Sequence, residues 1–239
     1  RVLFRSATIE NYKAFLKGKK IETQNSFSIQ FNELNGRFDY DFYSPENRKL
    51  FSNLTNFKTI RLGDICEIVK TKSRKLKDPN LIVEYVELSD INTHSYEIIN
   101  STTSQVHELP SRASYEIEQG DIITAIAGNS VGTRKHATAL VTEDLAGSIC
   151  TNGFRVFRNF KIDSYYLLYY LKSEMFLKQM FMYRTGAAIP NVSDTDLANI
   201  IIHLPEQKTI DDISNKMKKA FELRQASKQQ IESIELEFA

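Results

Sequence analysis

Short apolar runs dominate the region from Thr59 to about Phe160 and are separated by Gly, Asn, Asp, Pro and Ser. Runs of this length, rich in branched and aromatic residues, are typical of β-strands. The predicted strands are Ile65–Val69, Ile82–Leu88, Tyr96–Ile99, Ile122–Ala127, Ala139–Val141 and Phe154–Phe157, with a further strand at Ile200–Leu204 that ends before Pro205.

Apolar residues three and four positions apart predict helices on both sides of this strand-rich region. Ser164–Met182 is predicted to be one helix, closed by Gly186 as a C-terminal cap. Its predicted buried residues are Tyr165, Leu168, Leu171, Met175 and Phe176. Glu46–Asn56 follows a Ser-Pro pair, which favours the start of a helix, and Ser193–Ala198 is a short helical turn.

The first 45 residues give weaker signals. Residues 7–20 resemble a short helix, and Phe27–Phe31 alternates apolar and polar residues as a strand does. Arg37–Pro45 forms an aromatic and acidic linker.

The segment Glu206–Phe238 contains neither Gly nor Pro, and its apolar residues recur with heptad spacing. Arg224 and Ser227 interrupt the stripe where apolar residues are expected. A helix of this length is about 48 Å long, more than a small domain needs to cover its own core. We therefore expect a second helix to pack against the stripe, through Ile210, Ile213, Met217, Ala220, Ile231 and Ile234.

Composition places the chain among folded proteins. Of 239 residues, 41% are hydrophobic and 11% aromatic, and 31 Lys and Arg balance 30 Asp and Glu for a net charge of +1. This excludes wholesale disorder and binding of nucleic acid by bulk charge alone. No apolar run reaches the length of about 18 residues that a membrane helix needs. The two cysteines are too few for a disulfide framework. From these two observations together we expect a soluble cytoplasmic protein that does not contact a membrane.

Familiar enzymatic motifs are missing. The sequence has no glycine-rich phosphate loop, no paired histidines at zinc spacing, no Gly-x-Ser-x-Gly elbow and no tetrad of an amino-methyltransferase. One group of residues imitates the carboxylates and lysine of metal-dependent nucleases: Asp194, Asp196, Glu206 and Lys208. Here Glu206 and Lys208 follow a proline at the start of a predicted helix, whereas that chemistry usually has them on a strand. We therefore expect a chain without catalytic or metal-binding residues.

Several predicted loops carry side chains that suit nucleic acid. The strongest is a basic run between two strands, where five cations in eight residues could neutralise phosphates. Other predicted loops carry Arg, Lys, Asn, His and Ser, several of which match base edges in the major groove. A solvated loop without a partner is the alternative for the basic run, and alternation suggests that some candidates near residues 152–158 face outward from a strand. The candidates are Lys70, Lys72, Arg74, Lys75 and Lys77 in the basic run, and Asn92, His94, Asn129, Ser130, Arg134, Lys135, Asn152 and Arg155 in the other loops.

In order along the chain, seven short motifs resemble the DNA-specificity (S) subunit of type I restriction-modification systems. Each motif is weak alone, but their shared order over residues 36–239 is specific. They are Gly36–Pro45, Ile60–Ile65, Tyr85–Ile91, Gly120–Gly128, Tyr165–Ser173, Gly186–Pro190 and Ile200–Gln207.

The resemblance implies a mixed α/β (α+β) fold: a strand-rich target recognition domain at 36–205 and a long coiled-coil spacer helix at 206–239, after a lead-in at 1–35. It also implies that the chain recognises one half of a bipartite site in double-stranded DNA. A partner methyltransferase would carry the S-adenosylmethionine and methylate adenine, with a restriction nuclease subunit in the complex. The chain itself would hold no cofactor and would act in a prokaryotic cytoplasm.

Members of this family usually carry two recognition domains and two spacer helices, whereas this chain carries one of each. Three alternatives follow: a half-subunit that forms a homodimer, a fragment of a two-domain subunit, or the specificity region of a fused restriction-methylation enzyme. A homodimer predicts an interrupted palindromic target. A protein-interaction module that works through the long helix, without DNA, is the alternative of a different class.

Overall fold

This computed structural model describes residues 16–18, 28–34, 40–54, 56–186 and 188–237. The chain divides into two units, Arg1–Lys49 and Leu50–Ala239. The predicted helix at residues 7–20 lies almost entirely outside the described residues. The predicted strand Phe27–Phe31 is wrong, because residues 28–30 form no regular structure and Phe31–Glu33 is a 3-10 helix.

Helices lie on both sides of the Ser-Pro pair. Tyr40–Tyr43 forms α2, so the described end of the predicted linker is helical. Helix α3 spans Pro45–Leu54, with proline at its first position, and confirms the helix predicted at Glu46–Asn56.

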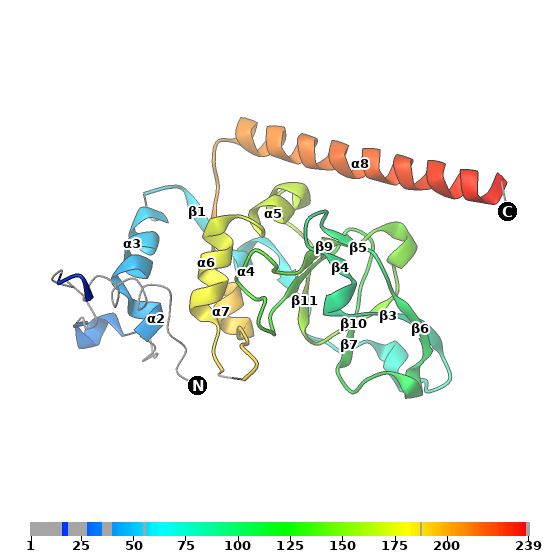
Figure 1. Cartoon of the computed structure of the whole chain (residues 1–239), viewed down its shortest axis with the longest axis horizontal. Helices are drawn as coiled ribbons and strands as arrows, with labels where there is room; N and C mark the ends of the chain where they lie inside the picture. Colours follow the sequence, from blue (N-terminus) through cyan, green and yellow to red (C-terminus); the bar gives the residue numbers. More distant parts are fainter. Residues whose placement is uncertain (1–15, 19–27, 35–39, 55, 187, 238–239) are drawn as a thin grey trace. The chain divides into compact units, whose positions relative to one another are not determined.

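The larger unit contains two four-stranded sheets. Figure 1 labels all strands of the first sheet, β3, β6, β7 and β10. In the first, the strand order is β6-β3-β10-β7, and only the β3–β10 pair is parallel. In the second, the order is β2-β11-β8-β9 and all pairs are antiparallel. The strands are β2 (Glu67–Ile68), β3 (Ile82–Val86), β6 (Thr102–Gln105), β7 (Ala113–Glu116), β8 (Ile122–Ala125), β9 (Thr138–Leu140), β10 (Ile149–Thr151) and β11 (Phe154–Arg158).

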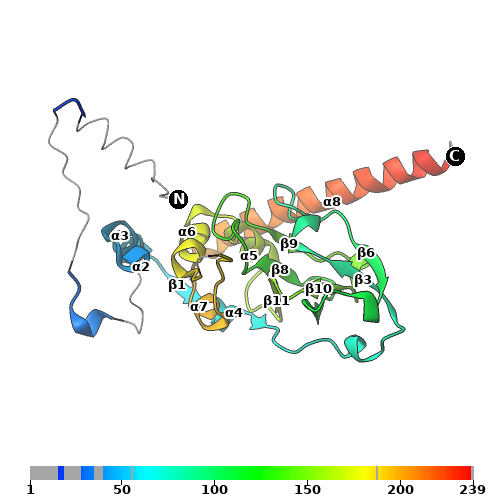
Figure 2. The same ribbon diagram turned by 60° about the horizontal axis from the view of Figure 1, so that its bottom comes forward.

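Two strand pairs complete the sheet structure. Strand β1 (Thr59–Arg61) pairs with β12 (Ile201–His203), which brings the two ends of the domain together. Strands β4 (Ile91–Asn92) and β5 (Glu97–Ile98) form a short hairpin. Figure 2 shows the labelled strands from a second direction.

Most predicted strands are confirmed, with shifted ends. The exception is Ile65–Val69, whose first residue belongs to the short helix α4 (Leu62–Ile65) and only two of whose residues form β2. The sequence pattern missed β1, β4, β6, β7 and β10. Strand β6 consists of Thr, Ser and Gln alone, so no hydrophobic alternation marks it.

The predicted helix Ser164–Met182 is two helices, α5 (Ser164–Tyr170) and α6 (Glu174–Tyr183). The break lies at Ser173, whose hydroxyl accepts a hydrogen bond from the Phe176 amide at 3.2 Å and so caps α6. Gly186 does not cap α6, because the cap residue is Arg184 in an extended conformation. The short helix predicted at Ser193–Ala198 is confirmed as α7 (Asp194–Ala198).

Helix α8 runs without a break over Gln207–Glu237, which confirms the long C-terminal helix (orange to red in Figure 1). Its first part packs against α5. Ile210, Ser214 and Phe221 are buried there, four and seven residues apart, which is the spacing of one face of a straight helix. This mixed, strand-rich domain with a long terminal helix is the predicted fold class.

Aromatic side chains fill the main core. Phe154 and Phe157 of β11 and Phe176 of α6 are fully buried. A separate small core lies in the sheet of β3, where Val83, Tyr85, Ala113 and Ile149 are buried. The second core orders the loops that leave this sheet, because partly buried apolar residues pack against it: Leu76, Leu81, Val106 and Leu109.

Candidate nucleic-acid interface

The basic turn, defined here as residues 70–77 between β2 and β3, faces solvent with four of its five cations. Lys70, Lys72, Arg74 and Lys77 are exposed, and residues 74–77 form the 3-10 helix η2. The fifth cation, Lys75, is half-buried. The exposed four suit contact with phosphates, since their charges are not covered by the fold.

Lys75 is held inside the fold by two oxygens. Its Nζ lies 2.9 Å from Glu116 Oε1 and donates to the carbonyl of Gly147 at 2.6 Å. The structure therefore gives this predicted DNA contact two partners within the chain.

The hairpin of β4 and β5 uses its asparagine to build a turn. Asn92 Oδ1 accepts hydrogen bonds from the amides of His94 and Ser95, at 3.0 and 3.2 Å. This side-chain turn leaves the His94 ring exposed, while Asn92 is half-buried. Tyr96 completes the turn with a φ of 61°. Of these two candidates, His94 is the one with an open side chain.

The glycine loop, defined here as residues 128–136 between β8 and β9, exposes Asn129, Arg134 and Lys135. Ser130 is half-buried, and its carbonyl accepts hydrogen bonds from the amide and hydroxyl of Thr133, at 3.0 and 2.8 Å. These bonds fold the loop into a tight turn that projects the three exposed side chains.

A buried histidine anchors the end of the glycine loop. His136 Nδ1 accepts the Gly132 amide at 3.2 Å, and its Nε2 lies 2.8 Å from Thr124 Oγ1. A ring with one accepting and one donating nitrogen is neutral. Burial, together with the nearby Lys172 ammonium, lowers the pKa of His136 to about 3, so the ring stays neutral.

The turn between β10 and β11 exposes Asn152 but encloses Arg155. Arg155 Nε lies 2.6 Å from Asp194 Oδ1, and its Nη1 donates to the carbonyls of Asn152 and Phe154. The Arg155 side chain is 15% exposed. It therefore ties α7 to β11, and Asp194, one of the nuclease-like carboxylates, is bound in this ion pair.

The basic turn and the glycine loop are held by different elements of the domain. The basic turn is held by Glu116 and Gly147, whereas the glycine loop packs on α6, where Gly132 faces the backbone of Phe181. The two loops are therefore anchored to different parts of the domain, the basic turn to β7 and residue 147, and the glycine loop to α6.

Sequence reasoning missed the residues that hold these loops. Ser73, Glu116 and Gly147 fix the basic turn, but they lie up to 74 positions apart and share no motif. Arg184 Nη1 donates to the carbonyl of Val131 in the glycine loop at 3.3 Å, across a sequence separation of 53. No local sequence signal identifies such partners.

The predicted helix–helix residues divide into two groups. Ile210 is buried and Ile213, Met217 and Ala220 are half-buried in this single chain. Ile231 and Ile234 are 55% and 54% exposed. The contact with a second helix stays a prediction, and the predicted residues that are exposed for it are the two near the end of α8.

Arg224 and Lys228 also face the chain's own domain. Arg224 donates to the carbonyl of Ser95 at 2.7 Å, and Lys228 lies 3.9 Å from Asp144. The charged residue that interrupts the heptad stripe therefore holds α8 against the β4–β5 hairpin.

The described part of the chain has neither a metal cluster nor a membrane helix. No group of three or more His, Cys, Asp or Glu side chains within these residues is arranged to hold a metal ion. Within the same residues, no helix is both long and apolar enough to span a membrane.

The chain is similar to type I restriction-modification proteins of known structure. One, from a study of the structural basis of complex assembly and conformational transition of the type I R-M system, is 27% identical, with a TM-score of 0.57. The HsdS subunit from Thermoanaerobacter tengcongensis is 28% identical, with a TM-score of 0.56. Each comparison covers 75% of this chain and 47% of the other, so this chain spans about half the length of these proteins.

No curated protein matches the chain. Residues 55–233, by contrast, match the family model described as the type I restriction modification DNA specificity domain. This match covers all of the strands and most of α8. The chain therefore belongs to the type I restriction modification DNA specificity domain family.

Proposed function

We propose that this chain recognises one half of a bipartite site in double-stranded DNA and directs a partner adenine methyltransferase to it. The observation that carries the proposal is the exposed basic turn on a domain of the DNA specificity family. Four uncovered cations on a chain of net charge +1 form a local site for phosphates. The other exposed loop residues then lie available for base edges.

Phosphate and base contacts divide between the loops. Lys70, Lys72, Arg74 and Lys77 position the duplex backbone. Base contacts come from the exposed members of the other loops, since Arg, Asn and His carry donors and acceptors that match base edges. These are His94, Asn129, Arg134, Lys135 and Asn152. The inward-facing Lys75 and Arg155 support the loops instead.

The chemistry belongs to partner subunits in this proposal. The chain carries no catalytic step, and S-adenosylmethionine binds to the methyltransferase. A restriction nuclease subunit joins the same complex in a prokaryotic cytoplasm. Ile231 and Ile234 support contact of α8 with a second helix, because they leave apolar surface uncovered.

Adenine methylation in cells tests this function directly. DNA is sequenced for modified adenines from cells that express the neighbouring methyltransferase, with and without this chain. We expect a modified motif that disappears when the chain is deleted. An interrupted palindrome supports a homodimer, and an asymmetric bipartite motif supports a fragment of a two-domain subunit.

Identical modification in both cells would contradict the proposal. A chain that binds a partner protein through α8 but binds no duplex DNA would then favour an interaction module. An active site found elsewhere in the same parent polypeptide would identify the specificity region of a fused enzyme.

A further inference from the structure

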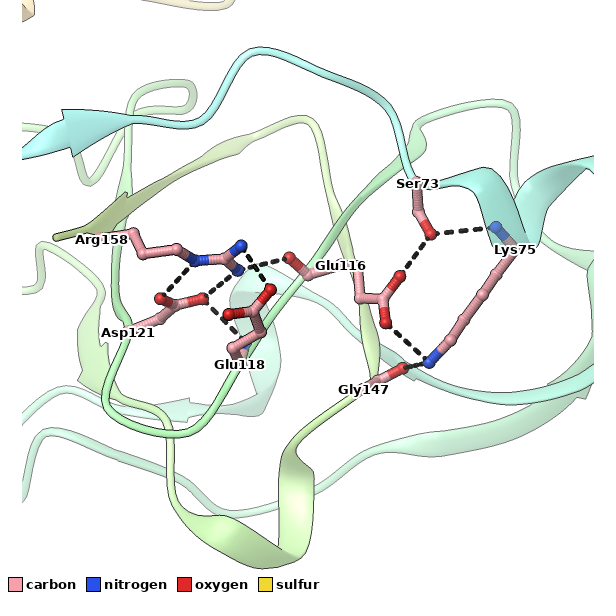
Figure 3. Close-up of polar contacts among 7 residues, drawn as sticks. All are labelled: Ser73, Lys75, Glu116, Glu118, Asp121, Gly147 and Arg158. Carbon is pink, nitrogen blue, oxygen red and sulfur yellow. Dashed lines mark hydrogen bonds and ion pairs between the residues drawn. The ribbon is translucent and has the colours of Figure 1, made fainter.

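The basic turn is closed by a hydrogen-bonded ring around Glu116 (Figure 3). Glu116 Oε1 binds Lys75 Nζ at 2.9 Å, and Oε2 accepts a hydrogen bond from Ser73 Oγ at 2.9 Å. Ser73 Oγ in turn accepts the Lys75 amide at 3.2 Å, which caps the 3-10 helix η2. One carboxylate therefore fixes both the cap and the side chain of the turn.

Backbone contacts tie the same ring to the sheet. The Ser73 amide donates to the carbonyl of Ser114 in β7 at 2.8 Å. The Lys75 ammonium donates to the Gly147 carbonyl at 2.6 Å. A Cβ at Gly147 would lie 3.0 Å from this nitrogen, and its φ of +87° also favours glycine. A side chain at position 147 would therefore crowd the Lys75 ammonium at this carbonyl.

The strand that carries Glu116 is itself braced from the opposite side. Arg158 donates to the Glu116 carbonyl at 3.3 Å and makes two hydrogen bonds to the buried Asp121, at 2.9 and 2.7 Å. Figure 3 shows the Arg158 network and the Lys75 network meeting at Glu116. Glu116 therefore lies on a strand that is held both by pairing with β10 and by Arg158 of β11.

The charges within the ring are balanced. Partial burial disfavours the charged form of Glu116, but the hydrogen bonds from Lys75 and Ser73 outweigh this and lower its pKa. Lys75 is matched by this carboxylate, so it adds little to the net positive charge of the turn. The four exposed cations supply that charge.

We propose that Lys75 and Glu116 are positioning residues, which together form a clamp that holds the basic turn for phosphate contact without touching DNA themselves. The proposal rests on the proposed DNA-binding function. Its ligand is the phosphate backbone of a duplex, contacted by Lys70, Lys72, Arg74 and Lys77. The clamp fixes the backbone of the turn beforehand, so it reduces the backbone conformational entropy that the turn loses when DNA binds.

The clamp predicts an effect opposite in sign to that of simple electrostatics. Replacing Glu116 by Gln removes a negative charge close to the basic turn, which by Coulomb's law alone strengthens DNA binding. It also breaks the ion pair with Lys75, and the positioning role then predicts weaker binding. The sign of the change distinguishes the two.

The experiment compares Glu116→Gln with Glu118→Gln in the full chain. Glu118 is a matched control, because it lies two residues away and pairs with Arg158 instead of the basic turn. Binding to a duplex of mixed sequence is measured over a range of salt concentrations. We expect Glu116→Gln to weaken binding about three- to tenfold, a modest factor because the Lys75–Glu116 pair is partly exposed. We expect Glu118→Gln to leave binding equal or stronger. Binding by Glu116→Gln as tight as that of the parent overturns the proposal.

Lys75 is tested through its coupling to Glu116. We expect Lys75→Met and Glu116→Gln to weaken binding by similar factors, and the double variant to be no weaker than either, because both changes break one clamp. A direct phosphate contact by Lys75 predicts additive losses and a salt slope lower by about 0.9 in Lys75→Met. Additive losses therefore exclude the positioning role.

A measurement without DNA separates failure of the clamp from failure of the proposed function. Amide hydrogen exchange is followed at Ser73 and Lys75 in both Gln variants. Faster exchange in Glu116→Gln alone supports the clamp, and unchanged exchange excludes it. A parent chain that binds no duplex contradicts the proposed function and the clamp's role in DNA binding, while the exchange result still decides whether the clamp exists.

Discussion

Gly132 of the glycine loop lies directly against the backbone of Phe181 in helix α6. A Cβ at Gly132 would lie 2.4 Å from the Phe181 nitrogen and 2.8 Å from the Leu177 carbonyl oxygen. Gly132 also has a φ of +73°, where side chains are strained. The loop that exposes Asn129 and Arg134 is therefore seated on a rigid helix, and only glycine allows this close contact.

Gly132→Ala should displace the glycine loop and destabilise the domain. Overpacking against helix backbone and strain at positive φ together predict a loss of about 2–5 kcal/mol in the free energy of unfolding. Gly128→Ala is the matched control, because Gly128 also has a positive φ but a Cβ there would have no atom within 4 Å. We expect about 1–2 kcal/mol for that variant in urea unfolding followed by circular dichroism. Equal losses in the two variants would show that contact with α6 is unimportant.

The basic turn should contribute to binding of every DNA sequence. Changing Lys72 and Arg74 together to Ala removes two exposed cations, so the slope of log K against log salt should fall by about 1.8, or about 0.9 for each contact. Binding to specific and random duplexes should weaken in parallel. The control is Lys218→Ala with Lys219→Ala, which removes two exposed cations from α8. An unchanged slope in the Lys72 and Arg74 variant would remove the turn from the interface.

The exposed side chains of the glycine loop should affect sequence preference instead. Arg134→Ala or Asn129→Ala should cost about 1–3 kcal/mol at one base position and relax the preference there. Binding to random duplex should change little. The measurement is selection of bound duplexes from a randomised pool, with sequencing. A uniform loss over all sequences would assign these residues to phosphate contacts.

Elements with a strong local period could be predicted from the sequence, and those defined by distant partners could not. Helix α8 has neither Gly nor Pro and keeps a heptad pattern on both sides of Arg224 and Ser227, and β8 and β11 are rich in branched and aromatic residues. Strand β6 is polar, and only its pairing with β3 makes it a strand. The predicted helix over residues 164–182 failed because apolar spacing continues through Ser173, whose capping bond begins a new helix.

The candidate site divides in the same way. Exposure of Lys70, Lys72 and Arg134 follows from their place in polar loops. The internal contacts of Lys75 and Arg155 depend on Glu116 and Asp194, at sequence separations of 41 and 39. A charge pattern along the chain does not reveal such pairs, so all basic residues of a loop look equivalent in the sequence.

Burial of neutral His136 should make stability fall with acid. Its pKa is about 3 in the folded chain and about 6.5 when unfolded, so below pH 6.5 the unfolded chain binds a proton that the folded chain does not. This residue alone should lower the free energy of unfolding by about 2 kcal/mol at pH 5, relative to pH 8. His136→Gln should flatten the dependence between pH 5 and 7. Parallel curves for the two proteins, measured by urea unfolding, would contradict this assignment.

The end of α8 should carry self-association, and its beginning should stabilise the domain. Ile231 and Ile234 are both more than half exposed and lie three residues apart on one helix face, so replacing both by Lys should abolish a dimer. Because neither side chain is buried in the single chain, the free energy of unfolding of the domain should change by less than about 0.5 kcal/mol. Phe221→Ala is the contrasting variant: Phe221 is buried and its ring centre lies 5.9 Å from that of Tyr165, so we expect a loss of about 3 kcal/mol. Sedimentation equilibrium over a range of concentrations gives the oligomeric state. A parent chain that remains monomeric, or a double Lys variant that remains dimeric, would exclude the end of α8 as the interface.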